Sequence, residues 1–339
     1  MRVGLTLGKY APLHNGHRHV IDTALGEVDH LIVLAYPAPE VTDVPLTVRM
    51  GWIRTLYPQV EVLAAWGGPT DVGYDLGTIR RHEEYIGAVL AGRKVTHFYS
   101  SERYGEHVSL ALGAVDRRVD EARLSVPISA TQVRADPFGN RHHVPPLVYR
   151  DLITHVAIVG APSTGKTTLA ERLARELGTV WTPEFGREYW HQHNVDRRLS
   201  HAQLLELAQG HLVLEEQRLR SANRYLFTDT NALTTATFSL DYHGAVGVEL
   251  DALAAAALTR YDLTILCDND IPYDDTPDRS GAAHREAFQQ LVVDDLKARR
   301  IPYVRVSGGL DERVQRVKSV LSGFRKYRSP YEPGEGACE

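Results

Sequence analysis

Short apolar runs alternate with amphipathic stretches through the first 150 residues. The apolar runs predict strands at residues 1–7, 31–35, 60–65 and 95–100, and apolar residues at helical spacing predict helices at 17–25, 47–57 and 79–90. Strands that alternate with helices in this way are typical of a doubly wound parallel sheet. We therefore expect an α/β fold for this half of the chain.

The same alternation returns in the second half. Strands are predicted at residues 153–159, 180–182, 225–230, 263–266 and 302–306, and helices at 168–177, 202–220, 284–300 and 310–321. Between the two halves, residues 136–146 contain Gly139 and paired prolines, which favour a linker. The pattern predicts two doubly wound domains, residues 1–147 and 148–325, followed by a disordered tail at 326–339.

A phosphate-binding motif joins the first strand and helix of the second half. The segment fits G-x-x-x-x-G-K-[ST], and its candidate ATP-binding residues are Gly160, Ser163, Thr164, Gly165, Lys166, Thr167 and Thr168. Lys166 would reach the β- and γ-phosphates, and Thr167 would ligate Mg²⁺. An ordinary glycine-rich turn would share the glycines, but the flanking strand and helix favour nucleotide binding.

Acidic residues follow two strands of this half. Glu184 is the first candidate for the base that accepts a proton from an attacking hydroxyl, although a solvated helix start would also contain Glu184 and Arg187. Asp229 follows an apolar strand, where a carboxylate would hold Mg²⁺, and it is the alternative base. Arg187 is a candidate substrate or phosphate ligand, and Arg279 lies in a polar segment expected to act as a lid.

Two separate segments of the first half indicate a second phosphate site. His14 and His17 are separated by Asn-Gly at a strand-to-helix junction, where a turn with one capping histidine is the alternative. About 110 residues later, Ser129, Thr131 and Arg134 supply two hydroxyls and a forked cation. The pair resembles the H-x-G-H and I-S-x-T-x-x-R signatures of the nucleotidyltransferase superfamily, which implies a Rossmann-like domain.

Two tryptophans are candidates for stacking on a flat ring. Trp66 ends a predicted strand before Gly67-Gly68, where it would meet a ligand at the edge of the sheet. Trp52 lies in an apolar helical pattern, which favours core packing.

The order of an adenylyltransferase followed by a P-loop kinase resembles one family, the bifunctional nicotinamide-nucleotide adenylyltransferase and ribosylnicotinamide kinase of the NadR type. The resemblance rests on residues 8–14 and 184–188, on residues 228–230 before Thr234-Thr235, and on the segment from Asp275 to Arg279, and it extends over residues 2–321. Members that also repress transcription carry an N-terminal helix-turn-helix domain. Here the first predicted strand begins at residue 2, so we expect that domain to be absent.

This resemblance implies two consecutive steps of NAD salvage. Nicotinamide riboside would be phosphorylated by ATP to NMN in the second domain, and NMN would be adenylylated by a second ATP to NAD and pyrophosphate in the first. Mg²⁺ is the implied cofactor, held by Thr167 and Asp229. Gly8, Lys9 and Tyr10 would bind ATP beside His14 and His17, and Trp66 would bind the pyridine.

Composition narrows the function classes. The chain has 43% apolar and 24% charged residues and a net charge of −5, without a block of basic residues, which argues against nucleic acid as the main partner. Cys267 and Cys338 suggest neither a disulfide framework nor a metal site. No apolar run reaches transmembrane length and no signal peptide is evident, so we expect a cytoplasmic protein without membrane insertion. The sequence leaves homo-oligomerisation open.

Two other functions remain alternatives. One keeps both reactions but acts on another nucleoside and its nucleotide. The other is a sensor of NAD or ATP that does not turn over; complete sets of candidate catalytic residues in both halves argue against it.

Overall fold

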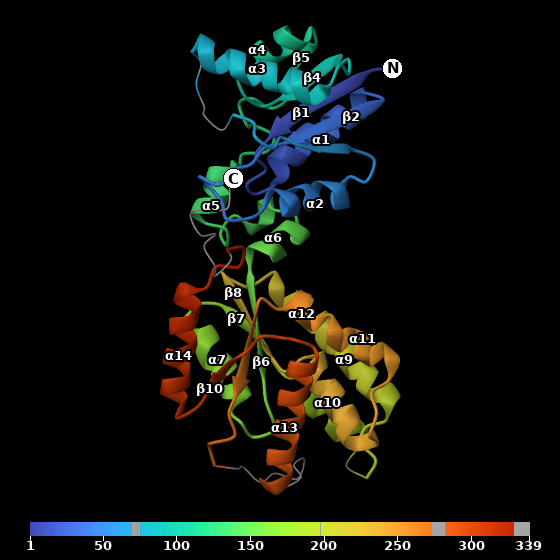
Figure 1. Ribbon diagram of the computed structural model, residues 1–339, viewed down its shortest axis with the longest axis vertical. Coiled ribbons are helices and arrows are strands. Elements are labelled where there is room, and N and C mark those ends of the chain that lie inside the picture. Colours follow the sequence, from blue (N-terminus) through green and yellow to red (C-terminus); the bar gives the residue numbers. More distant parts are fainter. Residues whose placement is uncertain (70–72, 74, 197, 273–281, 329–339) are drawn as a thin grey trace, which may run out of the picture. The chain divides into compact units, whose positions relative to one another are not determined.

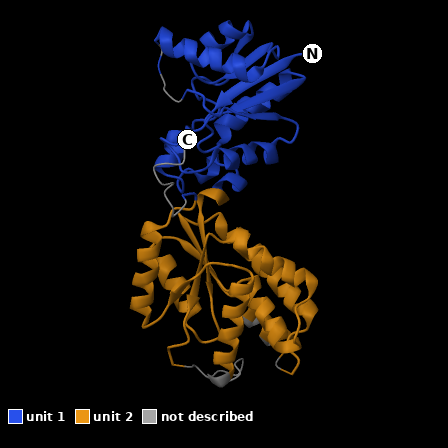
Figure 2. Ribbon diagram, in the orientation of Figure 1, with its two compact units in different colours: residues 1–149, 327–339 blue, residues 150–326 orange. Residues whose placement is uncertain are grey.

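The computed structural model describes residues 1–69, 73, 75–196, 198–272 and 282–328. The chain forms two compact units, residues 1–149 with 327–339, and residues 150–326 (Figure 2). Within the described residues, each unit contains a five-stranded parallel sheet flanked by helices (Figure 1). The expected fold class, two parallel-sheet α/β domains, is therefore confirmed.

Unit 1 has the strand order β3-β2-β1-β4-β5, with its first strand at the centre. Its elements are β1 (Val3–Gly8), α1 (Asn15–Glu27), β2 (His30–Ala35), α2 (Leu46–Leu56), β3 (Glu61–Ala64), α3 (Leu76–Leu90), β4 (His97–Ser100), α4 (Gly105–Leu112), β5 (Val115–Arg118), α5 (Ala130–Ala135), the 3₁₀ turn η1 (Arg141–His143) and α6 (Pro146–Leu152), which continues into unit 2. β2 and β3 lie on one side of β1, whereas β4 and β5 lie on its other side. In such sheets, ligands bind at the carboxyl ends of the two strands where the order changes side, here β1 and β4.

Unit 2 has the strand order β10-β9-β6-β8-β7, again with its first strand at the centre. Its further elements are β6 (Thr154–Val159), α7 (Lys166–Glu176), β7 (Val180–Thr182), α8 (Gly186–His193), α9 (His201–Leu219), β8 (Tyr225–Asp229), α10 (Ala232–His243), α11 (Val248–Ala255), α12 (Ala257–Arg260), β9 (Leu263–Cys267), α13 (Ala282–Ala298), β10 (Val304–Val306) and α14 (Leu310–Gly323).

The central strand β6 is apolar at successive positions because both faces of its sheet are covered. Val156 and Ile158 pack in one core cluster with residues of α7 and α14. Ala157 and Val159 face the other way, into a cluster with residues of α9, α10 and α13. A strand that is covered on both faces has a continuous apolar sequence. The phosphate-binding loop follows directly after the last residue of β6.

Several elements differ from the prediction. The segment 136–146, expected as a linker, contains η1 and meets α6, a helix that the sequence reading omitted. The boundary expected at residues 147 and 148 falls within α6, and the observed division follows Tyr149. The prediction also missed α4, β5, α10, α11 and α12. β5 is an edge strand with a polar, largely exposed sequence, and α10 is buried around most of its circumference, so neither shows a clear amphipathic period.

Candidate active sites

The two histidines of unit 1 cap the start of helix α1, and each ring is held by a hydrogen bond to the backbone. Nδ1 of His14 accepts from the backbone N–H of Gly16 at 3.1 Å, and Nδ1 of His17 accepts from the backbone N–H of His14 at 3.3 Å. The ring centroids are 3.9 Å apart. A Cβ atom at residue 16 would lie 2.8 Å from Cε1 of His14, so the glycine between the histidines lets the rings approach the backbone.

Both imidazoles are neutral at neutral pH. Burial, with a contribution from the charge of Arg123, lowers the pKa of His14 to about 4, and the same effects together with His14 lower the pKa of His17 well below its ordinary value. Because Nδ1 accepts a hydrogen bond in each ring, the proton of the neutral ring lies on Nε2. Each histidine can therefore donate one hydrogen bond to an anionic oxygen without carrying charge.

The second signature lies beside these histidines. Ser129 caps α5 by accepting from the backbone N–H of Gln132 at 3.2 Å. Arg134 donates to the carbonyl oxygen of Ala11 at 2.6 Å and to Oγ1 of Thr131 at 3.1 Å, which ties α5 to the loop after β1. His14, His17, Ser129 and Thr131 line one cavity of about 160 Å³, so the structure brings these four predicted residues together.

A larger cavity of about 490 Å³ adjoins the smaller one and shares His17, Ser101, Glu102 and Thr131 with it. Gly8, Lys9 and Tyr10 line this larger cavity, as expected for a ligand-binding loop after β1. Tyr10 has a positive φ of 47° and its ring contacts His17 at 4.9 Å between centroids. The ammonium group of Lys9 forms an ion pair with Glu40.

The two tryptophans lie in different environments. Trp52 is buried in the core, as expected. Trp66 is 61% exposed and is absent from the described lining of both cavities of unit 1, although its carbonyl oxygen accepts from the hydroxyl of Tyr85 at 2.8 Å. Its role in stacking on a pyridine stays a prediction.

In unit 2, the phosphate-binding loop wraps the start of α7. Gly160 has a φ of 143°, and a Cβ atom there would lie 2.8 Å from the carbonyl oxygen of Cys267, so only glycine fits this turn. Nζ of Lys166 donates to the carbonyl oxygen of Ala161 at 2.9 Å. Gly160, Ser163, Thr164, Gly165, Lys166, Thr167 and Thr168 all line a cavity of about 440 Å³.

The predicted metal ligands meet at the loop. Oγ1 of Thr167 donates to Oδ2 of Asp229 at 2.6 Å, and Asp229 is fully buried at the end of β8. A hydroxyl and a carboxylate are hard oxygen donors of the kind Mg²⁺ uses together with substrate phosphates. Within the described ranges, no group of three or more His, Cys, Asp or Glu side chains forms a site that could hold a metal by itself.

Glu184 and Asp229 occupy different positions relative to the cavity. Glu184 lines it from the turn between β7 and α8, whereas Asp229 is absent from the described lining and lies behind Thr167. The cavity is also lined by aromatic and hydroxyl groups to which the sequence reading gave no site role: Trp190, Phe238, Tyr242, Thr230, Thr234 and Thr235. The Thr-Thr pair in a short apolar stretch after Asp229 was the available signal.

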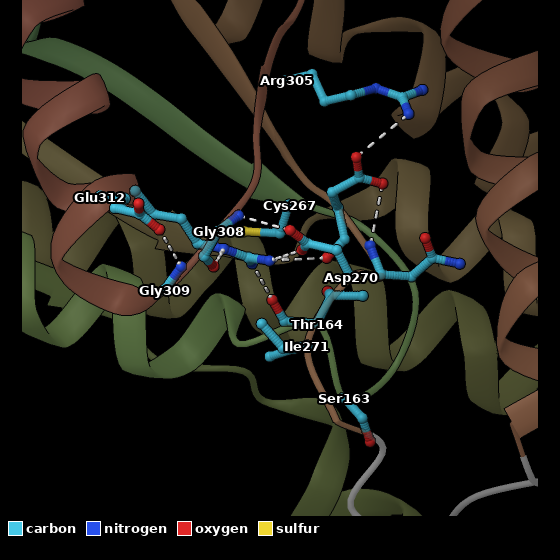
Figure 3. Close-up of polar contacts among 12 residues, drawn as sticks. Ser163, Thr164, Cys267, Asp270, Ile271, Arg305, Gly308, Gly309 and Glu312 are labelled. Carbon is cyan, nitrogen blue, oxygen red and sulfur yellow. Dashed lines mark hydrogen bonds and ion pairs between the residues drawn. The ribbon is translucent and has the colours of Figure 1, made fainter.

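Side chains far along the chain support the loop. Gln289 of α13 accepts from the backbone N–H of Ala161 at 2.7 Å and donates to the carbonyl oxygen of Cys267 at 3.0 Å. Arg313 of α14 donates to the carbonyl oxygens of Thr164 at 2.7 Å and Gly308 at 2.8 Å, and it pairs with Asp270. Figure 3 shows Thr164, Gly308 and Asp270 gathered around these contacts. No local motif marks either residue.

Two predicted residues cannot be assigned a contact. Arg187 is the second residue of α8, but its side chain lies outside the described part, and Arg279 with the rest of its predicted lid segment lies outside the described residues. Their roles stay predictions, as does the disorder expected for the tail, which falls largely outside the described residues. No helix within the described ranges combines the length and the apolar character needed to cross a membrane.

Comparisons with known proteins extend over both units. Residues 155–313 match the family model described as AAA domain. The trifunctional NAD biosynthesis/regulator protein NadR of Salmonella typhimurium is 29% identical over 337 residues, covering 90% of this chain and 78% of that protein. The NadR protein of Escherichia coli is 28% identical over the same coverage.

Solved structures agree with this similarity. A NadR protein in complex with NAD and AMP-PNP superposes with a TM-score of 0.55 at 20% identity, covering 97% of this chain and 98% of that one. A NadR protein in complex with NR gives the same TM-score at 23% identity and the same coverage. These structures share the fold of both units. The resemblance to the NadR type is thus confirmed: the chain is similar to the NadR proteins over 90% of its length.

Proposed function

We propose that the protein is a bifunctional enzyme of NAD salvage that phosphorylates nicotinamide riboside to NMN and then adenylylates NMN to NAD. The observation that carries this proposal is a cavity in each unit lined by predicted phosphate-binding residues, in a chain that is similar to NadR proteins over nine-tenths of its length. The substrates are ATP, nicotinamide riboside and NMN, and the products include NAD. The proposal keeps the expected cytoplasmic location.

The kinase step is assigned to unit 2. The 5′-hydroxyl oxygen of the riboside attacks the γ-phosphorus of ATP, the bond to the β–γ bridging oxygen breaks, and its electron pair leaves with ADP. Glu184 receives the hydroxyl proton, because it lines the cavity while Asp229 bonds Thr167. Mg²⁺, held by Thr167 and Asp229, would supply charge neutralisation on the phosphates. Lys166 orients the same phosphates.

The adenylyl transfer is assigned to unit 1. An anionic phosphate oxygen of NMN attacks the α-phosphorus of ATP, and the bond to the β-phosphate breaks to release pyrophosphate. No base is needed, so catalysis rests on positioning and charge stabilisation. His14 and His17 donate through Nε2–H. Thr131 accepts from Arg134 and so can turn its own hydroxyl proton toward a phosphate oxygen.

The riboside would bind against the aromatic residues that line the unit 2 cavity. Trp190, Phe238 and Tyr242 offer flat apolar surface for a pyridine ring. The hydroxyl of Thr234 is buried there, and Oγ1 makes no hydrogen bond to another described residue, so it can bond a polar group of the substrate. A panel of nucleosides tests this assignment: phosphorylation restricted to pyrimidine nucleosides would contradict it.

Single substitutions in each unit test the two-site scheme. His17→Ala should reduce NAD formation from NMN and ATP by roughly 10²–10³-fold and leave riboside phosphorylation unchanged, because it removes one preorganised donor. Lys166→Ala should do the reverse. His30→Ala and Lys318→Ala are matched controls, since each side chain bonds a carboxylate and neither residue is in the described lining of a cavity. Loss of both activities in a folded single variant would refute separate sites.

A further inference from the structure

The smaller cavity of unit 1 is lined by a permanently cationic side chain, Arg123, which belongs to neither sequence motif. Of the described residues that line it, only Arg123 carries a guanidinium or ammonium group. The two motif histidines beside it are held neutral, partly by the charge of Arg123 itself. The other motif cations are engaged: Arg134 bonds Ala11 and Thr131, and Lys9 pairs with Glu40. The positive charge of this cavity therefore comes from Arg123.

The loop that carries Arg123 is built to hold one shape. The carboxylate of Asp120 accepts backbone N–H groups from Leu124 at 2.8 Å, Ser125 at 3.0 Å and Val126 at 2.9 Å. The backbone N–H of Arg123 donates to the carbonyl oxygen of Asp120 at 2.8 Å. Asp120 and Arg123 both have positive φ, 50° and 52°, which these bonds maintain. The backbone of Arg123 is thus fixed before any ligand binds.

The guanidinium itself is held by a weak partner. Nη2 of Arg123 lies 3.0 Å from Oε1 of Glu102, and the two side chains are 41% and 50% exposed. Exposed ion pairs contribute little stability, so an incoming anion can replace the carboxylate at small cost. Glu102 lines both cavities of unit 1, as do His17, Ser101 and Thr131.

We propose that Arg123 binds the β- and γ-phosphates of ATP in unit 1 and stabilises the departing pyrophosphate, with Glu102 holding the guanidinium until the triphosphate replaces it. The inference rests on the proposed adenylyl transfer. As the new bond from the NMN oxygen to the α-phosphorus forms, the bond to the β-phosphate oxygen breaks and leaves its electron pair on pyrophosphate. Arg123 pairs with that growing negative charge, and no proton or further reactant is required.

Kinetics in both directions test this role. Arg123→Met should lower kcat/KM for ATP in NAD formation by about 10²-fold. In the reverse reaction of NAD with pyrophosphate, it should raise the KM for pyrophosphate by about tenfold or more and leave the KM for NAD within about twofold. Arg123→Lys should recover part of the loss, because it keeps the charge without the fork. Riboside phosphorylation, which is assigned to unit 2, should not change in the same variants, and the KM for NAD reports that unit 1 is folded.

Two further variants make the result specific. Arg117→Met is the matched control, since Arg117 of β5 pairs with Glu27 of α1 and is absent from the described lining of both cavities. Glu102→Gln should lower the KM for ATP up to about fivefold, and this effect should vanish in the Arg123→Met background. A wild-type KM for pyrophosphate in Arg123→Met, or an effect of Glu102→Gln that persists without Arg123, would overturn the proposal.

A binding measurement separates this inference from the proposed function. In the Lys166→Ala full-length chain, whose P-loop site is weakened, calorimetry with inorganic tripolyphosphate should show binding that falls tenfold or more, roughly, on adding Arg123→Met. If the wild-type chain formed no NAD but this difference were present, the proposed reaction would fail and the polyphosphate site would stand. Equal binding by the two chains would refute the site even if NAD were formed.

Discussion

His155 places an ionisable ring in the core of unit 2 next to cations. It is buried on β6, and burial together with the charges of Lys326, Arg150 and Arg260 lowers its pKa to about 3. In the unfolded chain its pKa is near the ordinary value of 6.5. As pH falls below 6.5, the unfolded chain binds a proton that the folded chain does not. Stability from the neutral ring is therefore complete above pH 6.5 and is lost as pH falls toward 3.

Replacing His155 should flatten the acid dependence of stability. Between pH 7.5 and pH 5.0, His155 lowers the free energy of unfolding of the wild type by about 2 kcal/mol. In His155→Leu and His155→Gln, the decrease between these pH values should be smaller by that amount. The measurement is urea unfolding followed by fluorescence at both pH values, as the difference between wild type and variant. A pH dependence equal to that of wild type in both variants would contradict the assigned pKa.

Helix α14 contacts the phosphate-binding loop through the side chain of Arg313. Its guanidinium is almost fully buried and bonds Thr164, Gly308 and Asp268 as well as Asp270. Four partners of one planar guanidinium hold α14 against the loop. Lysine offers the charge but cannot supply the fork.

Loss of this arginine should weaken both folding and ATP binding. Arg313→Met should lower the free energy of unfolding by about 2–3 kcal/mol, because buried carbonyl groups and a carboxylate lose a charged donor. The KM for ATP in riboside phosphorylation should rise roughly tenfold as the loop shifts. Urea unfolding and initial rates measure the two effects. Arg316→Met, at an exposed position of the same helix, should match wild type; equal behaviour of both variants would contradict the bracing role.

The elements show why sequence reading found some of the candidate sites and missed others. The chemistry of the loop after β6 and of the His14 turn is local, because a strand end, glycines and a helix start specify the geometry within ten residues. Arg313 and Gln289 bond that loop from more than a hundred residues away, and nothing adjacent to them predicts this. α10 escaped prediction for a different reason: it is buried around most of its surface, so the amphipathic period that reveals a helix is absent.

Each of the two units has its own sheet, core and cavity. Each reaction should therefore proceed without the catalytic residues of the other unit. NMN is the product of one proposed site and the substrate of the other. If NMN is released to solution between the steps, it must accumulate before NAD appears, and its concentration should set the rate of the second step.

Mixing the two inactive variants tests this independence. Equal amounts of His17→Ala and Lys166→Ala, given nicotinamide riboside and ATP, should form NAD after a lag, because NMN made by the first variant diffuses to the second. The time courses of NMN and NAD, followed by chromatography, should show NMN rising first, and added NMN should abolish the lag. Each variant alone should form almost no NAD from the riboside. The contrary outcome is a mixture that makes NMN but no NAD, while Lys166→Ala alone converts added NMN normally. The second step would then not use free NMN, and the predicted independence of the two units would be wrong.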